Sequence, residues 1–155
     1  MLIDIGLQRK DRKLIADSLN GILADKYFLL IKTQGYRWNV VGHSFHGLYD
    51  LLGQCHQELS IAIDQVAMRI RSIGQPCPGS YSEMVRITAI KEDPHISEST
   101  DMIRSLVLDN EMVIRRSHEV QELAQSVNDP VSSELMLARM RAHGQTAWLL
   151  RSFLE

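Results

Sequence analysis

The chain has 155 residues, of which 45% are hydrophobic and 23% charged, and its formal net charge is -2. This length and hydrophobic content predict a single domain with its own core, and the slightly negative charge excludes a nucleic-acid binder that relies on a basic surface overall. Two cysteines without disulfide or metal spacing, no signal peptide, and no apolar run near the roughly 18 residues of a membrane span together predict a cytoplasmic protein.

The first long helix is expected to begin between residues 8 and 11 and to run to about Trp38. Its apolar residues recur at steps of three, four and one, which is the spacing of one helix face. Asn39 and Gly42 bound a turn that leads into a second helix. The predicted face consists of Ile15, Leu19, Ile22, Leu23, Tyr27 and Leu30.

A basic cluster lies at the start of this helix. Cations at a helix N-terminus oppose the helix dipole, so the cluster has two interpretations: a solvated first turn, or a contact with DNA phosphates. DNA contact would place the protein on the nucleoid. The cluster consists of Arg9, Lys10, Arg12 and Lys13, with Asp11 between them.

The second helix, expected from Phe45 to Ile73, carries two stripes of residues. The first stripe is apolar and predicts a buried face: Leu48, Leu51, Leu52, Cys55, Leu59, Ile63, Val66, Ile70 and Ile73. The second stripe lies roughly 120° round the helix and comprises His46, Tyr49, Gly53, Ser60, Asp64 and Met68. Such a stripe is either an ordinary polar flank or a face that contacts a second neighbour.

The connection after the second helix is long. Pro76 and Pro78 break helicity within residues 74–79, because proline disfavours the α region for the residue before it. About 25 residues separate the two long helices, a length that predicts some structure of its own. An amphipathic turn or two is expected between residues 81 and 89.

The third long helix is expected from Ser99 to Gln125, with Ser99 or Ser97 as its N-cap. Pro130, after the turn at residues 128–129, begins the fourth helix. Two short connections and one long connection suit a four-helix bundle with a crossover. The predicted core face of the fourth helix consists of Leu135, Ala138, Ala142, Thr146, Leu149, Leu150 and Phe153.

Sequence motifs span most of the chain. They read LLxKTxxxxWNVxGxxFHxLxxLL from residue 29, LxxAIDxVAxRIRxIGxPxPGSYxEM from residue 59, then IKED, DNExVIR and HxxTAWLLRSxLE. In these motifs the chain resembles the Dps branch of the ferritin-like proteins, the DNA-binding proteins from starved cells. The resemblance implies one ferritin-like domain over residues 1–155: an all-α four-helix bundle with a short crossover helix between its second and third long helices.

The resemblance also implies a function. Dps-like mini-ferritins form hollow dodecamers with two-fold and three-fold contacts. They oxidise and store iron and protect DNA under starvation or oxidative stress. The alternative is a non-enzymatic shell or DNA-compacting assembly with the same architecture, and an unrelated helical interaction module is the third hypothesis.

The iron site of the family lies between two subunits. Two histidines come from one chain, and an Asp and a Glu four residues later come from its partner. The matching positions here are Arg37, Tyr49, Asp64 and Met68, of which only Asp64 keeps its type. Arginine has no lone pair to give a metal, and a methionine thioether suits iron poorly. The substitutions predict that the usual ferroxidase site is degenerate and leave open whether the chain is an enzyme.

Other residues are candidates for a part in that site. Trp38 matches the family's tryptophan beside the iron, and simple packing is its alternative role. His43, His46 and His56 are candidate replacement ligands, and His46 shares a stripe with Asp64. The Glu-x-x-His pairs that hold two irons inside other bundles are absent from the four predicted long helices.

Two carboxylates lie around the start of the fourth helix, Asp129 and Glu134. The resemblance places this region at a three-fold axis, where family members form an acidic entry pore for iron. The alternative is that both carboxylates simply stabilise the positive end of the helix dipole.

Overall fold

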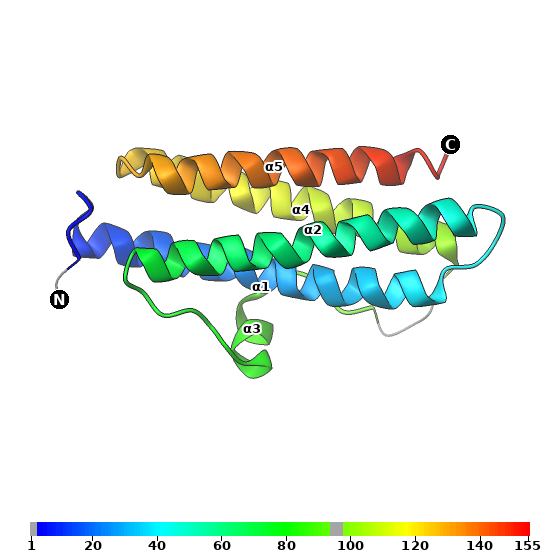
Figure 1. Cartoon of the computed structure of the whole chain (residues 1–155), viewed down its shortest axis with the longest axis horizontal. Helices are drawn as coiled ribbons and strands as arrows, with labels where there is room; N and C mark the ends of the chain where they lie inside the picture. The colour runs from blue at the N-terminus through cyan, green and yellow to red at the C-terminus, as the bar shows by residue number, and fades with distance from the viewer. Residues whose placement is uncertain (1–2, 94–97) are drawn as a thin grey trace.

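The computed structural model of the protein describes residues 3–93 and 98–155, which form five helices and, within those ranges, no strand. Four long helices run side by side, and one short helix stands outside them next to α1 (Figure 1). The predicted all-α bundle with a short crossover helix is confirmed. No helix in the described ranges is long and apolar enough to cross a membrane. The helices are α1 (Arg9–Asn39), α2 (Phe45–Ser72), α3 (Tyr81–Ile87), α4 (Ser99–Ser126) and α5 (Pro130–Arg151).

The long helices pack in pairs. The short connections make α1 antiparallel to α2 and α4 antiparallel to α5, and α1 also packs against α4 (Figure 1). The long connection between α2 and α4 crosses the outside of the bundle and carries α3. Stacking of the Tyr81 ring on Phe28 of α1, with ring centroids 5.7 Å apart, holds α3 in place.

Local signals explain most helix ends. Ser80 and Glu83 form a capping box at the start of α3, so two backbone N–H groups gain acceptors. The N-cap of α5 is Asp129, whose side chain accepts a hydrogen bond from the Ser132 amide at 3.1 Å. The prediction of Ser99 as N-cap of α4 is wrong: Ser99 is the first helical residue and Glu98 precedes it. The alternative cap, Ser97, lies outside the described residues.

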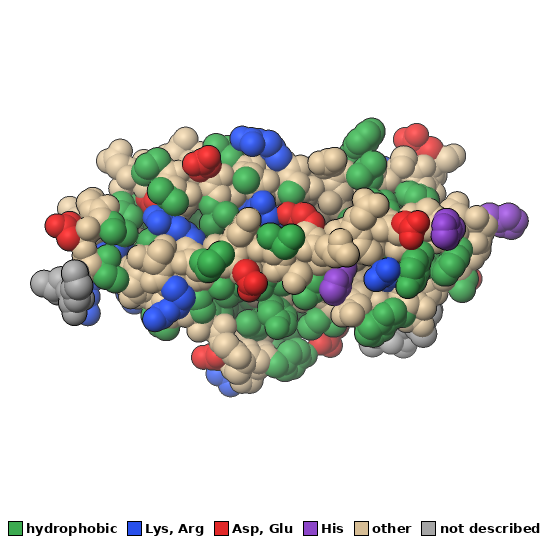
Figure 2. Space-filling view, viewed as in Figure 1, with side chains coloured by type: hydrophobic (Ala, Val, Ile, Leu, Met, Phe, Trp, Pro, Cys, Tyr) green, Lys and Arg blue, Asp and Glu red, His purple; other side chains and the backbone are tan. Residues whose placement is uncertain are grey.

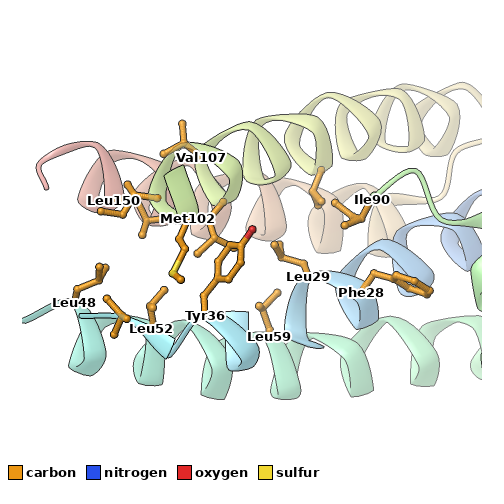
Figure 3. Close-up of a cluster of buried hydrophobic side chains, with 14 of the residues drawn as sticks. Phe28, Leu29, Tyr36, Leu48, Leu52, Leu59, Ile90, Met102, Val107 and Leu150 are labelled. Atoms are coloured by element: carbon orange, nitrogen blue, oxygen red, sulfur yellow. The ribbon is translucent and has the colours of Figure 1, made fainter. Parts of the chain in front are cut away.

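The core consists of two apolar clusters stacked along the bundle axis. The first, shown in Figure 3, includes Tyr36, Leu52, Met102 and Leu150. The second lies nearer the start of α1 and is built on residues from Ile15 to Leu23 together with Ile63, Val66, Ile70 and Met136. Burying each such aliphatic side chain contributes about 1.5–3 kcal/mol. Between the clusters, the middle turns of the helices bury a layer of polar side chains.

Candidate functional site

Arg37 and Tyr49, the two positions where the family has histidine ligands, contact each other within one chain. The guanidinium carbon of Arg37 lies 4.2 Å from the centroid of the Tyr49 ring, which is a cation–π contact. The Arg37 Nε–H donates to the backbone oxygen of Tyr49 at 3.3 Å. Arg37 of α1 is therefore laid across the first turns of α2.

Gly53 makes room for that arrangement. A Cβ added at Gly53 would lie 3.0 Å from the guanidinium carbon of Arg37 and 3.1 Å from its Nε. Both Gly53 and Tyr49 belong to the second stripe of α2, one helical turn apart. The three residues therefore complement one another: the guanidinium fills the space over the ring that the missing side chain of Gly53 leaves free.

The other two predicted ligand positions lie farther along α2. Asp64 is exposed, and Met68 is 63% exposed. Asp64 follows Tyr49 by fifteen residues, which is about 22 Å along a helix that rises 1.5 Å per residue. One chain therefore does not bring the four positions together, and only a second chain can do so. Within the described residues, no group of three or more His, Cys, Asp or Glu side chains could hold a metal ion.

The replacement candidates do not gather at this point either. The side chain of His46 is 92% exposed and faces Asp50, with Nε2 3.7 Å from the carboxylate. His46 precedes Asp64 by eighteen residues, about 27 Å along α2. Trp38 is 69% exposed, so it does not pack in the core of its own chain. His43 is exposed and His56 is half-buried.

The two predicted pore carboxylates have different environments. Asp129 is 1% exposed and receives a hydrogen bond from the guanidinium of Arg69 at 2.7 Å. Burial opposes its ionisation, but the hydrogen bonds from Arg69 and Ser132 outweigh burial and hold the pKa of Asp129 below its usual value. Glu134 is exposed, and both acids line a surface hollow of about 750 Å³. Asp129 thus has the helix-capping role, and Glu134 presents the exposed charge.

The basic cluster at the start of α1 divides into two pairs. Arg12 donates to the backbone oxygen of Ile73 at 3.2 Å, and Lys13 pairs with Asp17 at 2.6 Å. Arg9 and Lys10 are exposed on the first turn. Two of the four cations therefore have intramolecular partners, and Arg9 and Lys10 are the better placed for an external anion.

The centre of the bundle contains a row of hydrogen-bonded polar side chains that sequence analysis missed. The Nζ of Lys26 in α1 lies 2.5 Å from Nε2 of His143 in α5, and Nδ1 of His143 lies 2.7 Å from Oδ1 of Asn110 in α4. All three residues are at most 3% exposed. Lys26 stands three and four residues after the buried Leu23 and Ile22, so its position on the core face was a signal that the sequence already contained.

A second buried polar group ties the crossover to the bundle. The carboxylate of Asp25, which is 0% exposed, pairs with Arg116 of α4. It also accepts hydrogen bonds from the Thr88 hydroxyl at 3.0 Å and the Ala89 amide at 2.7 Å. A Cβ at Gly21 would collide with the Arg116 guanidinium at 2.5 Å, which accounts for a glycine inside α1. The buried carboxylate of Asp25 is thus engaged by an arginine and by hydrogen-bond donors of the crossover.

Comparisons with known proteins agree on the fold and the family. The ferritin-like domain family model matches residues 16–155. An uncharacterized low temperature-induced protein of Nostoc sp. is 35% identical over 99% of this chain and 87% of its own length. DNA protection during starvation protein 2 of Bacillus anthracis is 29% identical over 92% of this chain and 98% of its own. The crystal structure of the DPS protein from Vibrio cholerae, a ferritin-like diiron-carboxylate protein, matches with a TM-score of 0.93 and 26% identity, covering 100% of this chain and 98% of that one.

Proposed function

The chain belongs to the Dps branch of the ferritin-like family, and from this premise we propose that it forms a hollow dodecameric shell that sequesters iron and protects DNA under stress. We further propose that its inter-subunit site does not oxidise iron. Support for the first part comes from relatives that match 92% and 96% of the chain and are named for DNA protection during starvation. The second part rests on the residues at the site.

The contact of Arg37 with Tyr49 and Gly53 is the observation that carries the proposal. A ferroxidase site needs lone-pair donors around Fe(II) and open positions for the oxidant. An arginine stays protonated in proteins, so it donates hydrogen bonds and repels a cation. The close fit of the guanidinium against Gly53 and Tyr49 supports the proposal that these residues do not hold an iron ion.

In the shell, Arg37 would face Asp64 of the partner subunit. A guanidinium and a carboxylate form paired hydrogen bonds with favourable planar geometry. Such an ion pair would take the place of the metal and hold the two subunits together. Asp64 would then serve assembly, and iron would enter the shell without being oxidised at this point.

An exposed apolar face supports assembly with further copies of the chain. Large hydrophobic side chains are exposed on neighbouring parts of α1, α2 and α3, and Figure 2 shows hydrophobic side chains along this side of the molecule. We infer that an apolar face of this kind takes part in contacts between subunits. Its members are Tyr27, Ile31, Ile61, Met68, Tyr81, Val85 and Ile87.

The test is Fe(II) oxidation by dioxygen or hydrogen peroxide, followed by the absorbance of the ferric product. The parent is compared with the triple variant Arg37→His, Tyr49→His, Met68→Glu, which restores the family ligand types. We expect the parent to match the protein-free background and the assembled triple variant to exceed it.

A second variant, His46→Gln, tests the remaining explanation, in which His46 acts as a replacement iron ligand. If the parent oxidises iron rapidly and saturably, the proposal is wrong. Loss of that activity in His46→Gln would then identify His46 as the replacement ligand. A parent that takes up ferric iron only after oxidation elsewhere fits a storage shell, and one that takes up none fits the non-enzymatic alternative.

A further inference from the structure

The polar layer at the bundle centre has no part in the proposed function. We propose that Lys26, His143 and Asn110 form a proton-sensitive joint, which holds α5 against α1 and α4 near neutral pH and loosens when the medium becomes acidic. The joint connects three helices at a single point between the two apolar clusters.

The hydrogen bonds determine which group donates and which accepts at each contact among Lys26, His143 and Asn110. The side-chain nitrogen of Asn110 donates to the backbone oxygen of Leu106 at 2.7 Å, so its oxygen faces His143 as an acceptor. His143 must then carry its proton on Nδ1, which leaves the lone pair on Nε2. That lone pair accepts a hydrogen bond from Lys26 at 2.5 Å. One arrangement satisfies all three residues, and it requires a neutral imidazole.

A second proton on His143 breaks this arrangement. Nε2 would become a donor aimed at the Lys26 nitrogen, 2.5 Å away, with both residues at most 2% exposed. Two donors at that distance share no acceptor, and two buried cations repel each other strongly. The pair must separate, and because His143 is on α5 and Lys26 on α1, separation moves these helices apart.

The charges around the pair do not compensate for a second proton. The carboxylate of Glu58 in α2 acts on Lys26 across the bundle, but it pairs with Arg139 of α5 at 2.6 Å. Asp25, next to Lys26 in α1, pairs with Arg116 of α4. Burial, and then Lys26 and Arg139, lower the pKa of His143 well below its ordinary value. The surroundings therefore favour the neutral imidazole that the hydrogen bonds require.

A small cavity lies beside His143 and Asn110. It measures about 10 Å³, close to the space that one water needs, and is lined by Glu58, Asn110, His143 and Thr146 among others. Glu58 is partly exposed at the line where α2 meets α5. The buried imidazole and a partly exposed carboxylate therefore line the same cavity, and we infer that protons reach the joint on this side.

The test is amide hydrogen exchange in the middle of α5, residues 139–147, in the assembled full-length protein. Rates are corrected for the intrinsic pH dependence of exchange and compared at about pH 7.5 and about pH 5, on either side of the ordinary histidine pKa. In the parent we expect acidification to raise the corrected rate at least about tenfold, since the lowered pKa of His143 makes each pH unit below about 6.5 destabilise the folded joint.

Two variants break the contact between Lys26 and His143, one from each residue. His143→Gln keeps an acceptor for Lys26 but cannot titrate, so its corrected rates should not respond to acid. The control His118→Gln removes an exposed histidine of α4 and should behave like the parent. If His143→Gln fails to assemble, Lys26→Met serves instead: it removes one of the causes that lower the pKa of His143, so its corrected rates should respond less to acid than those of the parent. A parent that does not respond to acid, or an intact variant that responds as strongly as the parent, would overturn the proposal.

Discussion

Lys26→Met should stabilise the protein, because keeping the charged amine of Lys26 buried costs folding free energy. It is 0% exposed, and burial lowers its pKa from 10.5 to about 7, although Glu58 opposes the shift. At about 1.4 kcal/mol per pKa unit, that difference corresponds to roughly 5 kcal/mol of destabilisation below pH 7. Methionine keeps the length and volume of the side chain without its charge.

Loss of the hydrogen bond to His143 offsets part of this gain. An unpaired buried imidazole nitrogen costs about 1–3 kcal/mol, so the variant should be about 2–4 kcal/mol more stable near pH 6. The unfolded chain keeps the Lys26 proton up to about pH 10.5 and the folded chain only up to about pH 7, so the parent gains stability as pH rises between these values. Near pH 9 the advantage of the variant should therefore almost vanish.

Urea unfolding at equal protein concentrations, near pH 6 and near pH 9, measures the effect. Lys32→Met is the matched control, because Lys32 is also nearly buried but pairs with Asp109 at 2.6 Å. Removing Lys32 leaves that carboxylate without its cation and should destabilise the protein. A Lys26→Met variant that is less stable than the parent near pH 6, or whose advantage is the same at both pH values, would refute the reasoning.

Three further predictions concern the ends of the bundle and its assembly. Asp129→Ala should lower the free energy of unfolding by about 3 kcal/mol, because it removes the cap of α5 and leaves the nearly buried Arg69 without its partner. In thermal melts, the stability advantage of the parent over this variant should disappear as pH falls through the lowered pKa of Asp129. Arg9→Gln with Lys10→Gln should abolish a salt-sensitive DNA shift in gels, whereas Lys13→Gln, which removes a cation already paired with Asp17, should reduce it less. Native mass spectrometry should show twelve subunits, and a stable monomer as the sole species would contradict the assembly.

The apolar stripe of α2 was predictable from the sequence, whereas the buried face of α5 was not. Eight of the nine predicted residues on α2 are buried, and the other, Leu51, is half-buried. On α5 the predicted face is displaced by about one residue: Leu135 and Ala142 are half-buried, while Met136 and His143 are buried. The α5 pattern was misleading because its buried face includes polar residues whose partners come from distant parts of the chain.

Part of the candidate site was likewise predictable from the sequence and part was not. The resemblance to the family pointed to Arg37, Tyr49, Asp64 and Met68, and the expectation that three of these residues are poor iron ligands followed from their side-chain chemistry. The fit of Arg37 against Gly53 was not predictable, because Gly53 appeared only as one member of a stripe. A glycine that accommodates a side chain from another helix leaves no periodic signal, and neither does Gly21 beside Arg116.

The polar layer also gives the helices their register. Apolar stripes alone allow two helices to slide by one turn, about 5.4 Å, and still bury similar surfaces. Such a slide would separate Lys26 from His143 and Asp25 from Arg116, leaving charged groups buried without partners, a cost of several kcal/mol. The buried pairs thus select one alignment of α1 with α4 and α5.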